Sequence, residues 1–180
     1  STTNWLQQRR LTGSYRWDEI WNGVWDMPPM PNRAHQELEW ALETWLRQFW
    51  ARPGGNRVYH QINLAAPGGW PNKDYRITDL VLLTPDRFSI DHNEYFEGAP
   101  TVVVEIRSPG DETYEKFEFY ERLQVPEIWV IDRDRRTPEL HTLEQKVYQQ
   151  AQANPNGWLQ SRATGVDLRE TETQQLLLRL

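Results

Sequence analysis

Residues 102–134 read VVVEIRSPGDETYEKFEFYERLQVPEIWVIDRD, and the order of patterns in this stretch decides the fold. A β-branched and aliphatic run at 101–107 is followed by the chain breaker at 108–111, a helical pattern at 112–123 and a second apolar run at 127–132. Such apolar runs are typical of central strands covered on both faces. A strand, a helix and a strand in succession predict a right-handed crossover and a parallel pair.

The residues upstream add strands to this unit. Runs at 57–64 and 76–83 have strand character, and a polar loop at 84–100 joins the second of them to the central stretch. Before them, apolar residues recur at helical spacing over 32–50, with Asn32 placed to cap the first turn. The sequence therefore predicts one long helix that precedes the strands.

The two ends of the chain carry turn signals. Residues 16–28 predict a β-hairpin, because Asn22-Gly23 is a favoured pair for a tight type I′ turn. Residues 137–180 alternate short strand-like pieces with turns, and no repeat or linker interrupts the chain. We expect an α/β (α+β) fold in one domain spanning residues 1–180, with a mixed central sheet flanked by helices and an N-terminal hairpin.

Composition excludes several classes of protein. The 180 residues include no cysteine, which rules out disulfides and thiol catalysis. The net charge of −6 argues against the coating of nucleic acid by general electrostatics, but it is compatible with a local basic groove around a small acidic metal site. No apolar run approaches the roughly 20 residues needed to span a bilayer, and residues 1–10 lack the apolar centre of a signal peptide. We expect a cytoplasmic protein. The 10 tryptophans indicate packing and, in part, a homodimer interface.

Two carboxylates, Asp79 and Glu105, interrupt apolar strand patterns. An ionised carboxylate buried in such a strand is unfavourable by several kcal/mol unless a cation or hydrogen-bond donors compensate it. A divalent cation would relieve the burial of both acids and their mutual repulsion, and Mg²⁺ prefers oxygen ligands. The alternative is an internal ion-pair network with Arg76, Arg107 or Lys116.

Two basic residues favour a site. Arg107 lies two positions after Glu105, so both side chains point to one face of the strand. Lys116 lies on the next helix, four residues before Tyr120, and these two share a helix face. The arrangement can bring a metal, a phosphate and a water together. Taken singly, Lys116 and Tyr120 also fit an amphipathic helix with a solvated lysine.

The run from Val102 to Asp134, with its E-x-x-S-P, lysine, tyrosine and V-P-E-I-W-V-I-D elements, resembles the bacterial family called Uma-two. The N-G hairpin, Met27-Pro28-Pro29 and the helix start at His35-Gln36 fit the same family, so that the resemblance covers roughly residues 15–145. That family is assigned to the PD-(D/E)XK restriction-endonuclease-like superfamily. The resemblance implies a mixed sheet flanked by helices and Mg²⁺- or Mn²⁺-dependent hydrolysis of DNA phosphodiester bonds, by a homodimer as is common in the superfamily.

The resemblance also implies roles for single residues. Asp79 matches the motif aspartate and Glu105 the motif glutamate, which together hold the metal. Arg107 stands at the position of the superfamily's lysine, and a guanidinium is a poor water activator. Lys116 matches the lysine of the family's following helix and is expected to supply the ammonium.

Two points of the pattern differ or stay open. Thr78 replaces the proline that usually precedes the motif aspartate. Glu37 and Glu43 are candidates for an acid on the long helix that completes the metal site in some superfamily members, although their spacing also fits a solvated face.

Other constellations carry less weight. The histidines show no zinc-ligand spacing. His35 at the start of the long helix is a candidate to support the site, although its position favours a capping or packing role. Two functions follow: a metal-dependent endonuclease, favoured by the aspartate, glutamate and lysine, or an inactive nucleic-acid-binding or protein-interaction module that keeps the fold, favoured by Arg107 and the acidic charge.

Overall fold

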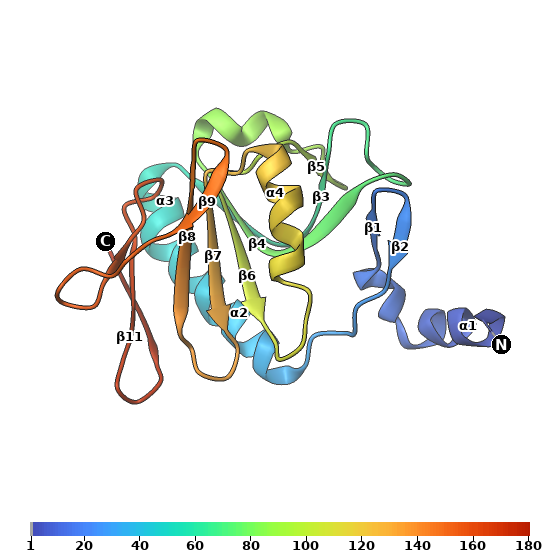
Figure 1. Ribbon diagram of the computed structural model, residues 1–180, viewed down its shortest axis with the longest axis horizontal. Helices are drawn as coiled ribbons and strands as arrows, with labels where there is room; N and C mark the ends of the chain where they lie inside the picture. Colours follow the sequence, from blue (N-terminus) through green and yellow to red (C-terminus); the bar gives the residue numbers. More distant parts are fainter. Residues whose placement is uncertain (1) are drawn as a thin grey trace.

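A nine-stranded mixed sheet forms the centre of the protein, which we describe from a computed structural model for residues 2–180 (Figure 1). The helical segments are α1 (Thr2–Thr12), η1 (Ser14–Trp17), α2 (Arg33–Trp45), η2 (Leu46–Ala51), α3 (Arg52–Gly54), η3 (Pro85–Ile90), η4 (Tyr114–Lys116) and α4 (Phe117–Leu123). The strands of this sheet are β1 (Glu19–Trp21), β2 (Val24–Asp26), β3 (Arg57–Ala65), β4 (Tyr75–Leu83), β5 (Phe96–Glu97), β6 (Val102–Arg107), β7 (Glu127–Asp132), β8 (Pro138–Glu144) and β9 (Val147–Gln150).

The strand order is β2-β1-β4-β6-β7-β8-β9, with β3 paired to β4 and β5 paired to β3. β6 and β7 are parallel, which confirms the crossover predicted from residues 102–134. β4 is antiparallel to β1, β3 and β6. The mixed sheet expected from the sequence is therefore present, and β4 and β6 lie side by side near its middle.

Apolar residues alternate along these strands and cover both faces of the sheet. Leu80, Leu82 and Val104 pack with the buried leucines of α2 in one core cluster. Val81 and Val103 pack with α4 in the other cluster. Figure 1 shows α2 behind the sheet and α4 in front of it. This alternation explains why the central strands carry continuous apolar runs.

The N-terminal hairpin and the start of the long helix match their predictions. Asn22 and Gly23 both have positive φ, at 48° and 83°, as a type I′ turn requires. Asn32 caps α2 by accepting the backbone N–H of His35 at 2.9 Å. The long helix runs beyond its predicted end at residue 50, through the π-helical turn η2 and α3, and stops where Gly55 adopts a φ of 67°.

Three segments differ from their predictions. The stretch 84–100 was expected to be a loop but contains η3 and β5, and α1 had no counterpart in the sequence patterns. The helix predicted at 112–123 begins as the 3₁₀ turn η4. These segments are short or weakly amphipathic. No helical or strand period of apolar residues can therefore be recognised in their sequence.

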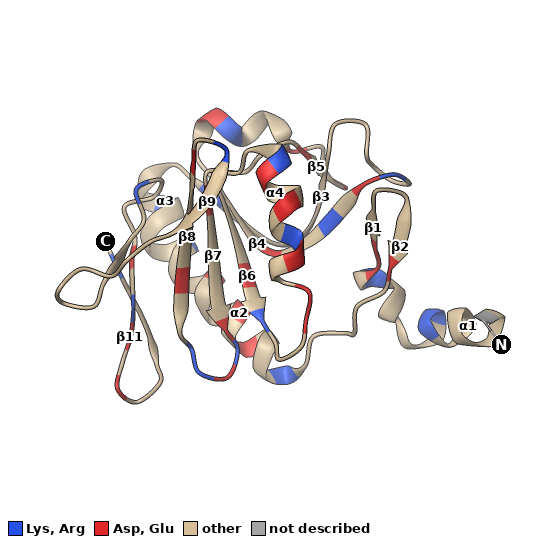
Figure 2. Ribbon diagram, in the orientation of Figure 1, with Lys and Arg blue, Asp and Glu red and all other residues tan. Residues whose placement is uncertain are grey.

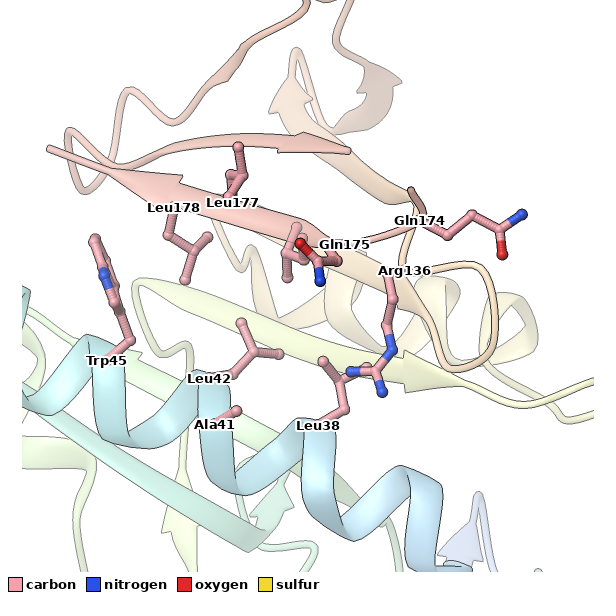
Figure 3. A pocket seen from close by; sticks show the side chains of 10 residues that line it. Leu38, Ala41, Leu42, Trp45, Arg136, Gln174, Gln175, Leu177 and Leu178 are labelled. Atoms are coloured by element: carbon pink, nitrogen blue, oxygen red, sulfur yellow. The ribbon is translucent and has the colours of Figure 1, made fainter. Parts of the chain in front are cut away.

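A second, three-stranded sheet packs beside α2 in the C-terminal region. It contains β10 (Leu159–Gln160), β11 (Asp167–Glu170) and β12 (Leu176–Arg179), in that order. Between α2 and β12 lies a groove of about 550 Å³, lined mainly by leucines and Trp45 (Figure 3). No helix among residues 2–180 is long and apolar enough to cross a bilayer.

Candidate active site

A short part of β4 has no strand partner on one side, and the candidate site forms there. β1 pairs with β4 at Tyr75, whereas the pairing with β6 begins at Leu80. Side chains satisfy the backbone in between: the carboxylate of Glu19 accepts the N–H of Ile77 at 2.9 Å. Buried backbone donors need such partners. The gap in strand pairing therefore explains why a carboxylate, that of Glu19, is bound within the sheet.

Asp79 and Glu105 come from the two strands that meet at this gap. The antiparallel register pairs Leu80 with Val104, and one further step of that register sets Asp79 opposite Glu105. Oδ2 of Asp79 accepts the backbone N–H of Ile106 at 2.7 Å. The charge of Asp79 contributes to raising the pKa of Glu105. The two acids singled out from the sequence are thus neighbours across two strands.

Glu105 is almost completely enclosed. It is 3% exposed, and its Oε1 accepts a hydrogen bond from the hydroxyl of Tyr120, which is also buried on α4. Nζ of Lys116 lies 3.7 Å from the same oxygen. Burial raises the pKa of Glu105 well above its ordinary value, although Lys116 opposes that rise. Without a bound metal ion, the buried site therefore favours the neutral form of Glu105 even with Lys116 nearby.

Lys116 links two parts of the chain that are far apart in sequence. Its ammonium lies 2.8 Å from the carboxylate of Glu19 and donates to the carbonyl of Ile77 at 2.9 Å. Burial alone would lower its pKa, but the charges of Glu105 and Glu19 outweigh burial and raise the pKa above its usual value. The lysine is therefore held as a cation between two acids.

His35 approaches Asp79 from the start of α2. Its Nε2 lies 3.1 Å from Oδ1 of Asp79, while its Nδ1 is buried without a partner among the described residues. Burial opposes the imidazolium, yet the hydrogen bond to Asp79 prevails and the pKa of His35 is raised. For Asp79, burial alone would raise the pKa, but the contacts with His35 and Lys116 outweigh burial and lower it. Besides the expected capping position, His35 thus has a side-chain contact with the site.

Glu39 is the acid of α2 that faces this region. It is 6% exposed, accepts from the side chain of Gln61 at 3.3 Å, and its Oε1 has no partner among the described residues. Burial and the charge of Asp79 raise its pKa to about 7. Glu39 was not predicted from the sequence. It lies next to the apolar stripe of Leu38 and Leu42, and an acid there is an unusual signal that could have identified it.

We expect Glu39→Gln to stabilise the metal-free protein at alkaline pH. A raised pKa means that the folded state prefers the neutral acid, so its contribution to stability is present below the unfolded pKa and is lost as pH rises through about 7. The variant should exceed wild type by about 3 kcal/mol near pH 8 and match it near pH 4. Urea unfolding with a chelator measures this difference, and Glu37→Gln, exposed on the same helix, is the matched control. A pH-independent difference would contradict the assignment.

The structure does not bring every predicted residue together. Arg107 does not line the cavity that Asp79, Glu105 and Lys116 share. Its guanidinium lies 3.7 Å from Asp132 and over the ring of Tyr114. Glu37 is exposed and paired with Arg33, and Glu43 pairs with Arg47 and His60; neither lines that cavity. Asp79, Glu105 and Lys116 do converge, and Glu19, His35 and Glu39 join them from other elements.

A cavity of about 440 Å³ with a strongly acidic lining is bordered by Asp79, Glu105, Lys116, Glu19 and His35, whereas Glu39 is not part of its lining. In Figure 2, acidic positions of β1, β2, β6 and the loop before α4 gather toward this end of the sheet. The cations that line it are Lys116 and Arg133. Its acids outnumber them and are Glu19, Asp26, Asp79, Glu105, Asp111 and Glu112.

The donor set fits a hard divalent cation. Within residues 2–180, no three acidic or histidine side chains form a ready-made metal cage. Mg²⁺, however, commonly uses one or two protein carboxylates and keeps several waters. Asp79 and Glu105 supply that pair, and the charge of Asp79 is felt by Glu39, which lies outside the cavity lining. An oxygen-rich set without thiolates suits Mg²⁺ or Mn²⁺.

A mixed sheet with a parallel crossover, flanked by α2 and α4, with an acid on each of two adjacent strands, defines the restriction-endonuclease-like class of fold. The chain belongs to the Uma2 family, described as "Putative restriction endonuclease", whose family model matches residues 6–171. The resemblance noted in the sequence is therefore confirmed.

A solved structure supports the same fold. It is described as a "putative nuclease belonging to DUF820" from Anabaena variabilis and matches with a TM-score of 0.64. The match has 16% identity and covers 82% of this chain and 83% of that chain. A comparison with curated proteins gave no match.

Proposed function

We propose that this protein is a metal-dependent nuclease that hydrolyses phosphodiester bonds in DNA. The observation that carries the proposal is the meeting of Asp79 and Glu105 at the interrupted edge of β4, with Lys116 between Glu105 and Glu19. Family membership supports the same chemistry. Asp79 and Glu105 would hold Mg²⁺ or Mn²⁺.

A divalent ion at these carboxylates supplies charge that polarises a phosphate and lowers the pKa of a water. His35 orients Asp79 through its Nε2, and the backbone N–H of Ile106 fixes the other oxygen of Asp79. Tyr120 fixes Oε1 of Glu105. These contacts hold both acids in place before a substrate arrives, which favours a preorganised site.

Lys116 acts as a donor and a positive charge. Its raised pKa keeps the ammonium protonated between Glu105 and Glu19, so it neutralises developing phosphate charge and does not accept a proton. Asp132 and the ring of Tyr114 hold the guanidinium of Arg107 away from this cavity. We propose that Arg107 contacts DNA outside the metal site.

Titration with Mg²⁺ or Mn²⁺ tests the metal site directly. We expect the melting temperature of wild type to rise with ion concentration by mass action, because the ion binds the folded site and not the unfolded chain. Asp79→Ala should show no such rise, whereas Asp134→Ala, an exposed acid bonded to Arg133, should behave as wild type. Equal responses of wild type and Asp79→Ala would overturn the proposed metal site.

Cleavage of plasmid and single-stranded DNA in the presence of the ion then tests turnover. Metal-dependent stabilisation without cleavage would favour the second function, a silent DNA-binding module on the same fold. We keep the homodimer as a prediction, since cutting both strands of a duplex uses two sites.

A further inference from the structure

One wall of the acidic cavity is apolar and comes from the N-terminal part of the chain. Trp17, at the end of η1, lines it together with the segment 27–31, which reads Met-Pro-Pro-Met-Pro. The wall shares one cavity with Asp79 and Glu105. Its volume of about 440 Å³ lies within the range of sites that take a small ligand.

The charges of this cavity disfavour recognition through the DNA backbone alone. Its acids exceed its two cations, Lys116 and Arg133, and the whole chain carries −6. Proteins that grip duplex DNA usually neutralise many phosphates with basic side chains. A polyanion that enters here must therefore gain binding energy from another source, and the apolar wall provides it.

Five of the ten tryptophans, among them Trp17, have rings without an aromatic-pair or cation–π contact among residues 2–180, and of these five only Trp17 lines this cavity; the other four are Trp25, Trp40, Trp50 and Trp129. Trp21 lies under Arg76, Trp70 packs on Tyr75 and Tyr95, and the ring of Trp158 lies under two arginines. No ring pair or cation–π contact within residues 2–180 involves Trp17. Trp17 thus combines a ring free of such partners with a place beside the proposed metal ligands.

We propose that this wall receives an unpaired nucleobase, so that the substrate is single-stranded or locally unpaired DNA. A base in a duplex is stacked between its neighbours and cannot reach a protein ring, whereas an unpaired base can stack on one. Base stacking on aromatic side chains is sequence-tolerant and supplies affinity that an acidic cavity lacks. The inference rests on the proposed nuclease function, whose metal site adjoins the wall.

Binding of dye-labelled oligonucleotides tests the inference. A short single strand, its duplex, and a single strand with abasic sugars at its central positions are titrated by fluorescence anisotropy. Ca²⁺, which also takes oxygen ligands, replaces Mg²⁺ to limit hydrolysis, and gels verify that the strands stay intact. Wild type should bind the single strand more tightly than either the duplex or the abasic strand.

Trp17→Ala should raise the Kd for the intact single strand about 5- to 100-fold, and should leave the Kd for the abasic strand nearly unchanged. Trp17→Phe keeps an aromatic face and should retain most of the affinity. Trp40→Ala removes a tryptophan that is 69% exposed on α2 and should behave as wild type. Melting curves show whether each variant folds, and the comparison of intact, abasic and duplex strands in wild type tests the inference if Trp17→Ala does not fold.

Equal or tighter binding of the duplex, or an equal loss of affinity for intact and abasic strands on replacing Trp17, overturns the inference. Failure of the proposed nuclease function has a different signature. The metal titration and the cleavage assay would then be negative in wild type while the Trp17-dependent preference for bases persists. Absence of binding to every strand would overturn the inference together with the DNA substrate.

Discussion

Glu105→Gln is expected to lower the rate of metal-dependent DNA cleavage about 1,000-fold, because a divalent ion contributes several kcal/mol to stabilising the charge of the transition state. Glutamine has nearly the shape of glutamate but lacks the charge that holds the ion. Steady-state cleavage of a labelled DNA strand measures the loss.

The same substitution should leave the metal-free fold intact. The raised pKa of Glu105 shows that the buried site prefers the neutral acid, which glutamine imitates. The melting temperature without metal should therefore equal or exceed that of wild type, whereas the rise on adding Mg²⁺ should vanish. Glu37→Gln, on the exposed side of α2, should retain cleavage. Cleavage by Glu105→Gln at the wild-type rate would place the active site elsewhere.

Lys116→Met should destabilise the fold by about 3 kcal/mol, because removing one partner of a buried ion pair leaves an uncompensated charge. The lysine is only 14% exposed and lies 2.8 Å from Glu19, which is itself buried. Methionine keeps much of the length and bulk of the side chain, so that packing changes little. Urea unfolding at neutral pH measures the loss of stability.

A second substitution separates charge from packing. Glu19→Gln in the Lys116→Met background removes the carboxylate that has lost its ammonium partner and should recover part of the stability, although Glu19→Gln alone is unfavourable because it takes the nearer partner from Lys116. Lys73→Met, at an exposed position, should have little effect. If Lys116→Met were as stable as wild type, Lys116 would be solvated in solution and could not serve as the fixed cation of the site.

The strands and the crossover could be predicted because each depends on a local pattern. Residues 102–107 and 127–132 are mostly apolar, and both are central strands in the structure. Asn22-Gly23 specified its hairpin because few other pairs adopt two positive φ angles in succession. The carboxylates of Asp79 and Glu105 could be found for the same reason, since each breaks an apolar period.

The partners of those carboxylates could not be predicted in this way. Glu19, His35 and Glu39 reach the site from a hairpin and a helix that lie far from Glu105 in sequence, and nothing local marks which face of each element meets β4. For Arg107 the local pattern predicted the face of the strand but not the contacts of the side chain. Asp132 and Tyr114 hold its guanidinium outside the cavity.

The sequence by itself determined the type and order of the central elements and the two acids that interrupt them, because apolar periodicity and turn chemistry act over a few residues. Only the tertiary structure decided that β1 leaves β4 before β6 joins it. The part of β4 without a strand partner on this side needs hydrogen-bond partners from side chains, and Glu19, Lys116, Asp79 and the backbone of Ile106 meet there. Such a gap depends on contacts between distant segments, which no local pattern encodes.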